Sequence, residues 1–370
     1  MALRARLQSW FAKAWQRRGV LARALLPLAL LHGLWRRFDV WRYRAGLAQP
    51  QRLPVPVVVI GNLYVGGSGK TPLTIEVTRA LRARGWSPGV ISRGYGAGRA
   101  SPRAVQVNGS ASDYGDEPLL IARASQVPVA VGTDRAAAAR LLLNLNPHVD
   151  VIVADDGLQH RRLARDVEIA VVHEAGFGNG WLLPAGPLRD PPWRLDSVDA
   201  VVLHGLTPPV RIYSPFFRMK TSISCAYPLK DPVRRFALAD LAAEQRVGNQ
   251  TCVAAAGIGN PERFFAMLRA FGLEITTLAL GDHYDFARNP FLDLRFDRAF
   301  ITEKDAVKCA ANTSLANDAR LYVVPLEAQV DAALIDLIEA RVRPTQETRH
   351  HGPSPARDPR LSDHQGTPGL

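Results

Sequence analysis

Several features that would identify a protein class at once are missing from this sequence of 370 residues. It holds three cysteines, Cys225, Cys252 and Cys309, which lie too far apart for a disulfide or metal-binding pattern and indicate thiols in a reducing compartment. There is no internal repeat. There is also no Asn-Lys-x-Asp run, the usual guanine-reading motif, so a GTPase is disfavoured.

Acidic residues are almost absent from residues 1–44, which contain one, Asp39, and ten lysines and arginines. Seven aromatic residues share this segment, together with the apolar stretch Ala24–Trp35. As a helix that stretch would span roughly 18 Å, short of the ~30 Å hydrocarbon core, and no small-x-small cleavage site follows as in a signal peptide. We expect residues 1–44 to lie on a membrane surface, and the alternative is an amphipathic helix docked on the protein itself.

The net charge of +12 predicts an acidic partner: nucleic acid, an anionic membrane or a phosphorylated substrate. Because the positive charge clusters with tryptophan at the N-terminus, we expect no nucleic acid partner.

The stretch Val55–Pro72, VPVVVIGNLYVGGSGKTP, predicts a phosphate-binding loop. A buried strand, a glycine-rich turn and a helix follow one another, so backbone N–H groups and the positive helix N-terminus face the same point. The expected nucleotide-binding residues of the turn are Gly66, Gly67, Ser68, Gly69, Lys70 and Thr71. Lys70 can reach the β- and γ-phosphates of ATP, and the Thr71 hydroxyl can bind Mg²⁺.

An acidic pair, Asp155 and Asp156, ends the apolar strand of VDVIVADDGLQH. A carboxylate at the C-terminal end of a strand beside the phosphate loop can bind Mg²⁺. The two aspartates and Thr71 are therefore the predicted metal ligands, and a polar turn is the alternative.

Phosphoryl transfer also needs cations to neutralise charge and a group to accept a proton. Arg93, Arg135 and Arg189 each stand at a strand or loop end, although each alone would be an ordinary surface arginine. Asp116 could be a catalytic carboxylate or a helix N-cap. His283, between two aspartates in GDHYDF, is an acid/base candidate.

Alternating strands and helices predict an α/β protein with mostly parallel sheets. We expect a nucleotide-binding domain over 45–210, a β linker and a smaller α/β domain over 211–343, and a disordered tail over 344–370. Thr133 is the expected N-cap of one helix, and Asp331–Val342 is the last helix of the smaller domain. Thr302 is the expected N-cap of another helix, with a substrate-site role for residues 302–305 as the alternative.

Nine sequence blocks together resemble the tetraacyldisaccharide 4′-kinase family over about residues 20–340. They are GNLYVGGSGKTP, SRGYG, GDEP, VGTDR, ADDGLQH, LLPAGPLRD, AAAGIGNPERFF, GDHYDF and ITEKDAVK. The resemblance implies a P-loop fold of two α/β/α domains joined by a β linker, with an N-terminal membrane-associated helix. It further implies an ATP- and Mg²⁺-dependent lipid kinase at the cytoplasmic face of the inner membrane, which phosphorylates a tetraacyldisaccharide 1-phosphate to form lipid IVA.

The resemblance also implies residue roles. Asp116 corresponds to a general base and His283 to its partner. Lys70, Thr71, Asp155 and Asp156 correspond to ATP and Mg²⁺ residues, and Gln159, Arg93, Arg135 and Arg189 to residues lining the active site. Two positions depart from the family pattern: Tyr64 replaces a small hydroxyl residue and Asp190 a glutamate.

A second hypothesis is a membrane-associated regulatory ATPase, in which nucleotide switches a partner and Asp116 and His283 are dispensable.

Overall fold

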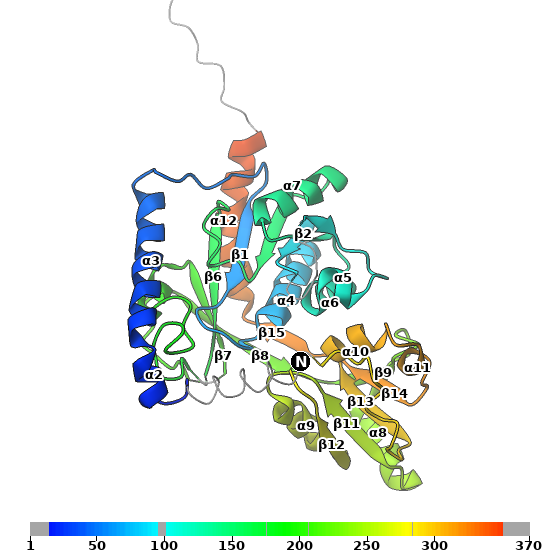
Figure 1. The fold of residues 1–370 in the computed structure, drawn as a ribbon. Coiled ribbons are helices and arrows are strands. Elements are labelled where there is room, and N and C mark those ends of the chain that lie inside the picture. The colour runs from blue at the N-terminus through cyan, green and yellow to red at the C-terminus, as the bar shows by residue number, and fades with distance from the viewer. Residues whose placement is uncertain (1–14, 95–100, 175, 206, 283, 351–370) are drawn as a thin grey trace, which may run out of the picture.

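The computed structural model describes residues 15–94, 101–174, 176–205, 207–282 and 284–350, with the side chains of 344–350 left out. These residues form an α/β fold with two mixed sheets, one of nine strands and one of six (Figure 1). We call the nine-stranded sheet and the helices packed on it the larger unit, and the six-stranded sheet with its helices the smaller unit.

The larger sheet has the order β15-β8-β7-β6-β1-β5-β2-β4-β3. Its central strands are parallel and fully buried, which explains their continuous Val/Ile-rich sequences. The strands are β1 (Val57–Gly61), β2 (Pro88–Ser92), β3 (Arg103–Ala104), β4 (Val129–Val131), β5 (Val151–Asp155), β6 (Val167–His173), β7 (Ala200–His204), β8 (Phe216–Ser222) and β15 (Glu327–Val330).

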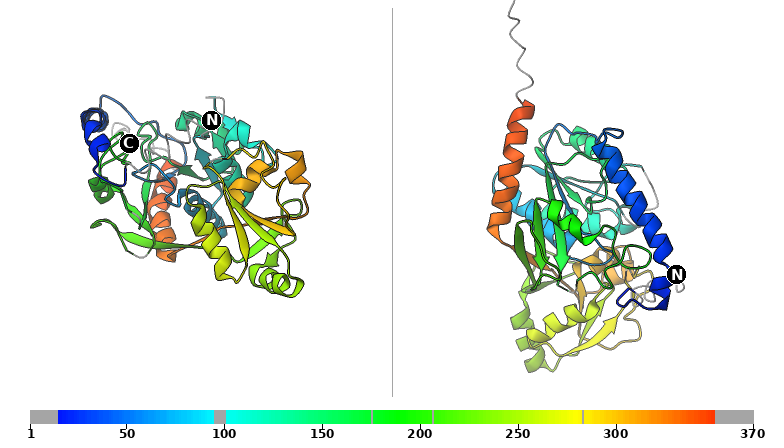
Figure 2. Two further views of the ribbon diagram at one scale, coloured as in Figure 1. Left: turned by 60° about the horizontal axis from the view of Figure 1, so that its bottom comes forward. Right: turned by 90° about the vertical axis from the view of Figure 1, so that its left-hand side faces the viewer.

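Helices cover both faces of this sheet. On one face α4 (Lys70–Ala83), α6 (Asp116–Ser125) and α12 (Ala332–His350) share a hydrophobic core with the strands. On the other face α7 (Arg135–Leu145) and the loops after β5 and β6 form a second core. The helices α2 (Val20–Ala24) and α3 (Leu26–Arg44) lie on the outside of that second face, on the opposite side of the sheet from α12 (Figure 2, right).

The smaller sheet has the order β10-β9-β14-β13-β11-β12 and also lies between two layers of helices. One core contains α8 (Leu238–Gly248) and α9 (Pro261–Ala270), and the other α10 (Glu303–Cys309) and α11 (Thr313–Ala316). The strands are β9 (Cys225–Pro228), β10 (Phe236–Ala237), β11 (Cys252–Ala256), β12 (Ile275–Ala279), β13 (Arg298–Thr302) and β14 (Leu321–Val324).

A two-stranded ribbon joins the units. β8 and β15 pair antiparallel in the larger sheet, and the strands that follow β8 and precede β15, β9 and β14, pair antiparallel in the smaller sheet. The sequence analysis placed all of residues 211–343 in the linker and smaller domain, and here the structure differs. β8, β15 and α12 belong to the larger unit, because Leu334, Ile338 and Val342 of α12 are buried in its core.

Two predicted helix ends have different outcomes. Asp134, not Thr133, is the N-cap of α7, since its carboxylate accepts from the backbone N–H groups of Ala136 and Ala137. Thr302 is the N-cap of α10, as predicted, and accepts from the N–H of Asp305. The last helix, α12, continues to His350, beyond the predicted end at Val342; residues 351–370 lie outside the described part of the chain.

The helix α3 is attached to the larger unit by few residues. Ala29 is the one residue of this fully described helix that is buried. Arg36 reaches inward to Asp190, with Nε 2.9 Å from the carboxylate oxygen Oδ1. Within the described ranges, no helix is both long and apolar enough to span a bilayer.

Candidate active site

The glycine-rich turn lies between β1 and α4, as the sequence predicts, and α4 begins at Lys70. Gly69 is the N-cap and has φ of +95°, a conformation that favours glycine. A Cβ atom there would lie 2.7 Å from Nδ1 of His204 and 2.8 Å from Cε of Met219. Gly69 therefore lets the loop approach β7 and β8 closely.

Tyr64 anchors the start of this loop. Its side chain is buried, packs edge-on against Phe177 with ring centroids 5.7 Å apart, and its hydroxyl accepts from the N–H of His173 at 3.0 Å. Burial raises the pKa of Tyr64 to about 12, so the hydroxyl stays neutral. The Tyr64 side chain thus ties the loop to the end of β6.

Lys70 and Arg189 converge on Asp156. The Nζ of Lys70 is 3.7 Å from Asp156 Oδ1, and Nη1 of Arg189 is 2.9 Å from Oδ2. Asp156 has φ of +51°, a conformation uncommon outside glycine and often found at functional sites. Burial acts to raise the pKa of Asp156, but Lys70 and Arg189 outweigh it and lower that pKa, so the carboxylate is charged.

Asp155, the last residue of β5, lies deeper than Asp156. It accepts hydrogen bonds from the hydroxyls of Thr74 at 3.1 Å and Ser92 at 3.2 Å. Burial, with the nearby Glu117 and Asp156 carboxylates, raises the pKa of Asp155 to about 7. A cation bound beside the two aspartates would offset this cost of holding adjacent negative charge.

The Thr71, Asp155 and Asp156 side chains offer oxygen ligands, the kind Mg²⁺ prefers. Across the described residues, no three His, Cys, Asp or Glu side chains gather as a metal cluster. Mg²⁺ is commonly bound through one or two carboxylates and substrate phosphates rather than by such a cluster. The donor set therefore fits the predicted ion.

Asp190 is buried and forms an ion pair with an arginine of α3. It binds Arg36 of α3, and its Oδ2 accepts from Nε2 of Gln159 at 3.0 Å. Gln159 also donates to the carbonyl of Asn62 at 2.9 Å. These contacts connect α3 to the residue that follows β1.

Arg135 is buried as the first residue of α7, and its Nη1 donates to the carbonyl of Gly132 at 2.8 Å. Burial lowers the pKa of Arg135 to about 10, although Asp155 and Asp156 favour its charged form. Arg93, exposed after β2, is close enough for its charge to act on Arg135. Arg135 thus lies near the acidic pair, and Arg93 lies near Arg135.

Asp116 is the first residue of α6 and is 8% exposed. Gly115 holds the N-cap position, so the N-cap interpretation of Asp116 is wrong. The Nζ of Lys304, from α10 of the smaller unit, is 3.8 Å from Asp116 Oδ2 and 3.2 Å from Glu117 Oε1. His283, its predicted partner, lies outside the described residues.

Lys304 is not singled out by the sequence, which favours a capped helix start over 302–305 and leaves a substrate-site role as the alternative. In the sequence, Lys304 stands in the first turn of the capped helix that begins with TEKD. In the folded chain its ammonium contacts Glu117 of α6. Burial acts to lower the pKa of Lys304, but Glu117 and Asp116 outweigh it and raise that pKa. A positive charge from the smaller unit therefore stands beside two carboxylates of the larger one.

Residues 21–343 match the family model for tetraacyldisaccharide-1-P 4′-kinase. The chain is 49% identical to the tetraacyldisaccharide 4′-kinase of Janthinobacterium sp. (strain Marseille), over 93% of this chain and 99% of that protein. It is 48% identical to that of Herminiimonas arsenicoxydans, over 92% and 97% of the two chains.

A solved structure is also similar. The crystal structure of the "apo" form of LpxK from Aquifex aeolicus in complex with ATP aligns with a TM-score of 0.72 and 27% identity. The alignment covers 87% of this chain and all of the other.

Proposed function

Since the chain belongs to the tetraacyldisaccharide-1-P 4′-kinase family, we propose that the residues described above carry out that reaction. The protein is a tetraacyldisaccharide 4′-kinase of lipid A biosynthesis. The observation that supports the residue assignment best is the convergence of Lys70, Arg189 and the Asp155–Asp156 pair at the N-terminus of α4.

The phosphate loop holds the donor, ATP. Backbone N–H groups at Gly66–Gly69 and the positive end of α4 bind phosphate oxygens, and Lys70 stabilises charge on the β- and γ-phosphates. Its contact with Asp156 holds the Lys70 ammonium at the mouth of the loop. Arg189, Arg135 and Arg93 add positive charge around the transferred group.

Mg²⁺ would be held by Thr71 and the two aspartates, where it would neutralise charge that develops on the phosphates. Ser92 and Thr74 position the Asp155 carboxylate by hydrogen bonds to its two oxygens. Gln159, bound to Asn62 and Asp190, keeps the loop after β5 in place.

The acceptor is the 4′-hydroxyl of the tetraacyldisaccharide 1-phosphate, and Asp116 is its general base. The hydroxyl oxygen attacks the γ-phosphorus, its proton passes to the Asp116 carboxylate, and the bond between that phosphorus and the bridging oxygen of ADP breaks. The product of this step is lipid IVA. Lys304 holds the Asp116 side chain from the smaller unit.

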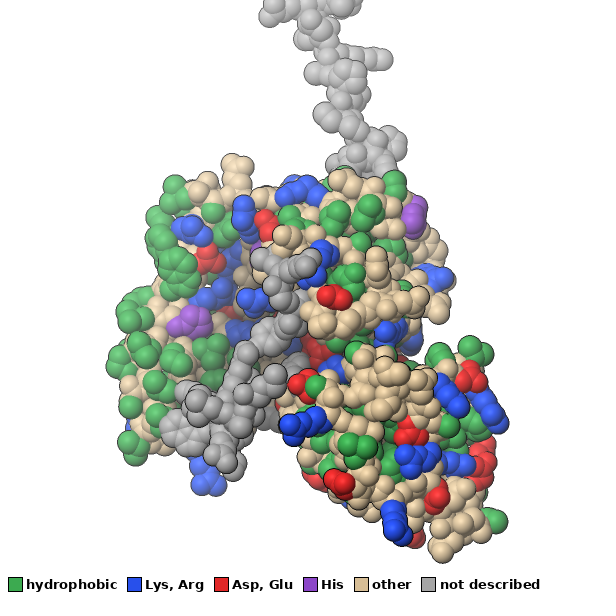
Figure 3. All heavy atoms as spheres, turned by 45° about the vertical axis from the view of Figure 1, so that its right-hand side comes forward, with side chains coloured by type: hydrophobic (Ala, Val, Ile, Leu, Met, Phe, Trp, Pro, Cys, Tyr) green, Lys and Arg blue, Asp and Glu red, His purple; other side chains and the backbone are tan. Residues whose placement is uncertain are grey.

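The lipid acceptor would be reached from a membrane surface, with residues 1–44 as the contact. Hydrophobic side chains gather along the left-hand edge of Figure 3, where α2 and α3 lie. The exposed large apolar residues of α3 are Leu28, Leu30, Leu31, Leu34, Trp35, Phe38 and Trp41. Basic side chains follow them in the last turn of the helix, as in an interfacial helix at the cytoplasmic face of the inner membrane.

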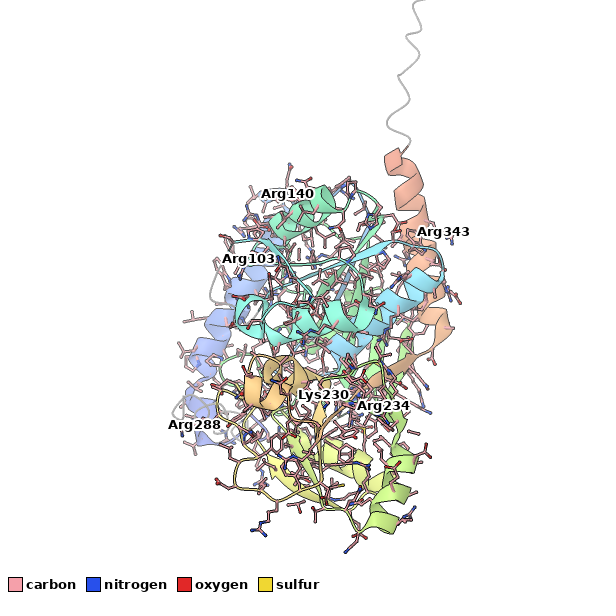
Figure 4. All side chains as sticks on the ribbon, turned by 90° about the vertical axis from the view of Figure 1, so that its right-hand side faces the viewer. Arg103, Arg140, Lys230, Arg234, Arg288 and Arg343 are labelled. Carbon is pink, nitrogen blue, oxygen red and sulfur yellow. The ribbon has the colours of Figure 1, made fainter. Side chains whose placement is uncertain are left out.

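A nucleic acid partner is not part of this proposal. The labelled basic residues of Figure 4 come from β3, α7, α12 and loops of the smaller unit, and they are spread over the height of the molecule. A nucleic-acid-binding surface usually gathers positive charge in one stripe or patch.

The experiment is transfer of label from γ-labelled ATP, with Mg²⁺, to tetraacyldisaccharide 1-phosphate in detergent micelles. We expect label in the lipid with the parent protein and little with Lys70→Ala. Label released only as free phosphate would contradict the assignment and favour a regulatory ATPase.

A further inference from the structure

Arg263 of α9 reaches from the smaller unit to three side chains of the larger one. Its Nη2 is 2.9 Å from Nε2 of His204 and donates to Oγ1 of Thr221 at 2.7 Å. Its Nη1 is 3.3 Å from Nε2 of His173. These residues end β6 and β7 and belong to β8, so one arginine contacts three adjacent strands of the larger sheet.

The chemistry of Arg263 determines how His204 is protonated. An arginine side chain can only donate hydrogen bonds, so the Nε2 atom that faces it must accept. The imidazole hydrogen is then on Nδ1, which lies 3.1 Å from the carbonyl oxygen of Ser68. His204 therefore donates to the phosphate loop while it accepts from the smaller unit. Burial, with the charge of Arg263, lowers the pKa of His204 to about 4, which keeps this neutral form.

Ser68 and Gly69 are the two residues directly before Lys70. Ser68 is buried, and its hydroxyl accepts from Nδ2 of Asn62 at 3.1 Å. The His204 ring fills the space against Gly69 that a side chain would need. The last two residues of the loop thus rest directly on the His204 ring.

We propose that Arg263 is a positioning residue for the phosphate loop: acting through His204, it holds the Ser68 carbonyl so that the loop N–H groups and Lys70 face the nucleotide. The inference rests on the proposed nucleotide site and extends it by coupling ATP affinity to the docking of α9. The smaller unit then contributes to donor binding without touching ATP.

The test compares ATP affinity, kcat and KM in Arg263→Met, His204→Asn and the double variant. Asparagine places an amide N–H near the position of Nδ1, so it keeps the donor to Ser68 but loses the contact with Arg263. We expect Arg263→Met to raise the Kd and the KM for ATP about tenfold, with kcat changed less than threefold. In the His204→Asn protein, Arg263→Met should then add less than twofold, because the connection is already broken.

Thr221→Val is the control, since it removes another acceptor of Arg263, and with it the 3.1 Å contact between that hydroxyl and Nε2 of His204, but leaves the contact between Arg263 and His204 in place. We expect its Kd for ATP to stay within twofold of the parent value. Unchanged ATP affinity in Arg263→Met, or full additivity in the double variant, overturns the inference.

If Arg263→Met does not fold, a second comparison tests whether Arg263 acts on the phosphate loop through His204. His204→Gln places its amide near Nε2 and keeps the contact with Arg263, while His204→Asn keeps the donor to Ser68. Both substitutions should raise the Kd for ATP, since either one interrupts the path. An effect of His204→Gln alone would show that Arg263 is not needed.

These outcomes are separable from failure of the proposed function. If the parent transfers label and Lys70→Ala does not, the nucleotide site stands whatever Arg263→Met does. If the parent binds no ATP, both proposals fall together.

Discussion

The two units are each packed around apolar cores, but they meet through charged and polar side chains. The larger unit has one hydrophobic core on each face of its sheet, and so has the smaller unit. Among the described residues, none of these four clusters contains side chains from both units. At their interface Lys304 meets Asp116 and Glu117, and Arg263 meets two histidines and a threonine.

This difference between the units suggests that each contributes a different part of the site. We propose phosphate and metal binding for the larger unit, where Asp155 and Arg135 are buried and Gly69 packs closely against His204. The smaller unit contributes cations on long side chains, at an interface that includes a small cavity between the loop at 108–110 and α10. No hydrophobic cluster of the described residues crosses this interface, so we expect the smaller unit to move relative to the larger one without disrupting a core.

The largest effect should come from the larger unit's own cation. Lys70→Ala removes the ammonium that faces the phosphates, and we expect transfer to fall about 10²–10³-fold. Lys230→Ala, at an exposed loop position, is the control and should retain parent activity. A Lys70→Ala enzyme with more than a tenth of the parent rate would show that the loop does not bind the reacting phosphates.

The next effect should fall on the stability of the larger unit alone. Arg36→Met leaves the Asp190 carboxylate, only 3% exposed, without its arginine, and removing one partner of a buried pair costs about 3 kcal/mol. Denaturant unfolding followed separately in each unit should show the larger one weakened and the smaller one unchanged. Arg37→Met, at the exposed neighbouring position, should change neither; equal losses in both units would mean that their cores are not independent.

A smaller effect is expected from the cation that crosses the interface. Lys304→Met removes the charge beside Asp116 while leaving the phosphate loop intact, so kcat should drop about 10–100-fold. The Kd for ATP should change less than threefold in equilibrium binding. A drop in ATP affinity as large as the drop in kcat would assign Lys304 to the donor site instead.

The smallest effect concerns pH. The pKa of His204 is about 4 in the folded chain, lowered by burial and by Arg263, against about 6.5 when unfolded. As pH falls below 6.5 the unfolded chain takes up this proton first, so stability present above pH 6.5 is lost progressively toward pH 4.

His204→Asn lacks this proton. Between pH 7.5 and 5.5 we therefore expect the parent to lose more free energy of unfolding than the variant, by on the order of 1 kcal/mol or less. The exposed His148→Asn serves as control and should follow the parent curve. Parallel curves for all three proteins would mean that His204 is protonated alike in both states.

The same comparison explains what could be predicted from the sequence. The positions of the glycine-rich turn and of the Asp155–Asp156 pair were predictable because each lies at the end of a buried strand, and the C-terminal ends of parallel strands meet at one edge. Lys304 and Arg263 were not recognised, because a lysine or arginine on a helix surface carries no sign of the unit it will contact.

The division of the chain at residue 211 was harder to predict for a related reason. The amphipathic pattern of α12 shows that one face is buried, but not against which sheet, and the return of the chain through β15 decides that. Thr133 and Asp134 are both capping residues, and only the hydrogen bonds distinguish them.

The most direct test of the account is a comparison of ATP binding and single-turnover transfer in Asp116→Asn. Asp116, the proposed general base, lies next to the smaller unit beside Lys304, whereas the phosphate loop lies at the start of α4 in the larger unit. We therefore expect parent ATP affinity with transfer lowered about 10²–10⁴-fold. Transfer at the parent rate would contradict the base assignment, and loss of ATP binding would place Asp116 in the donor site.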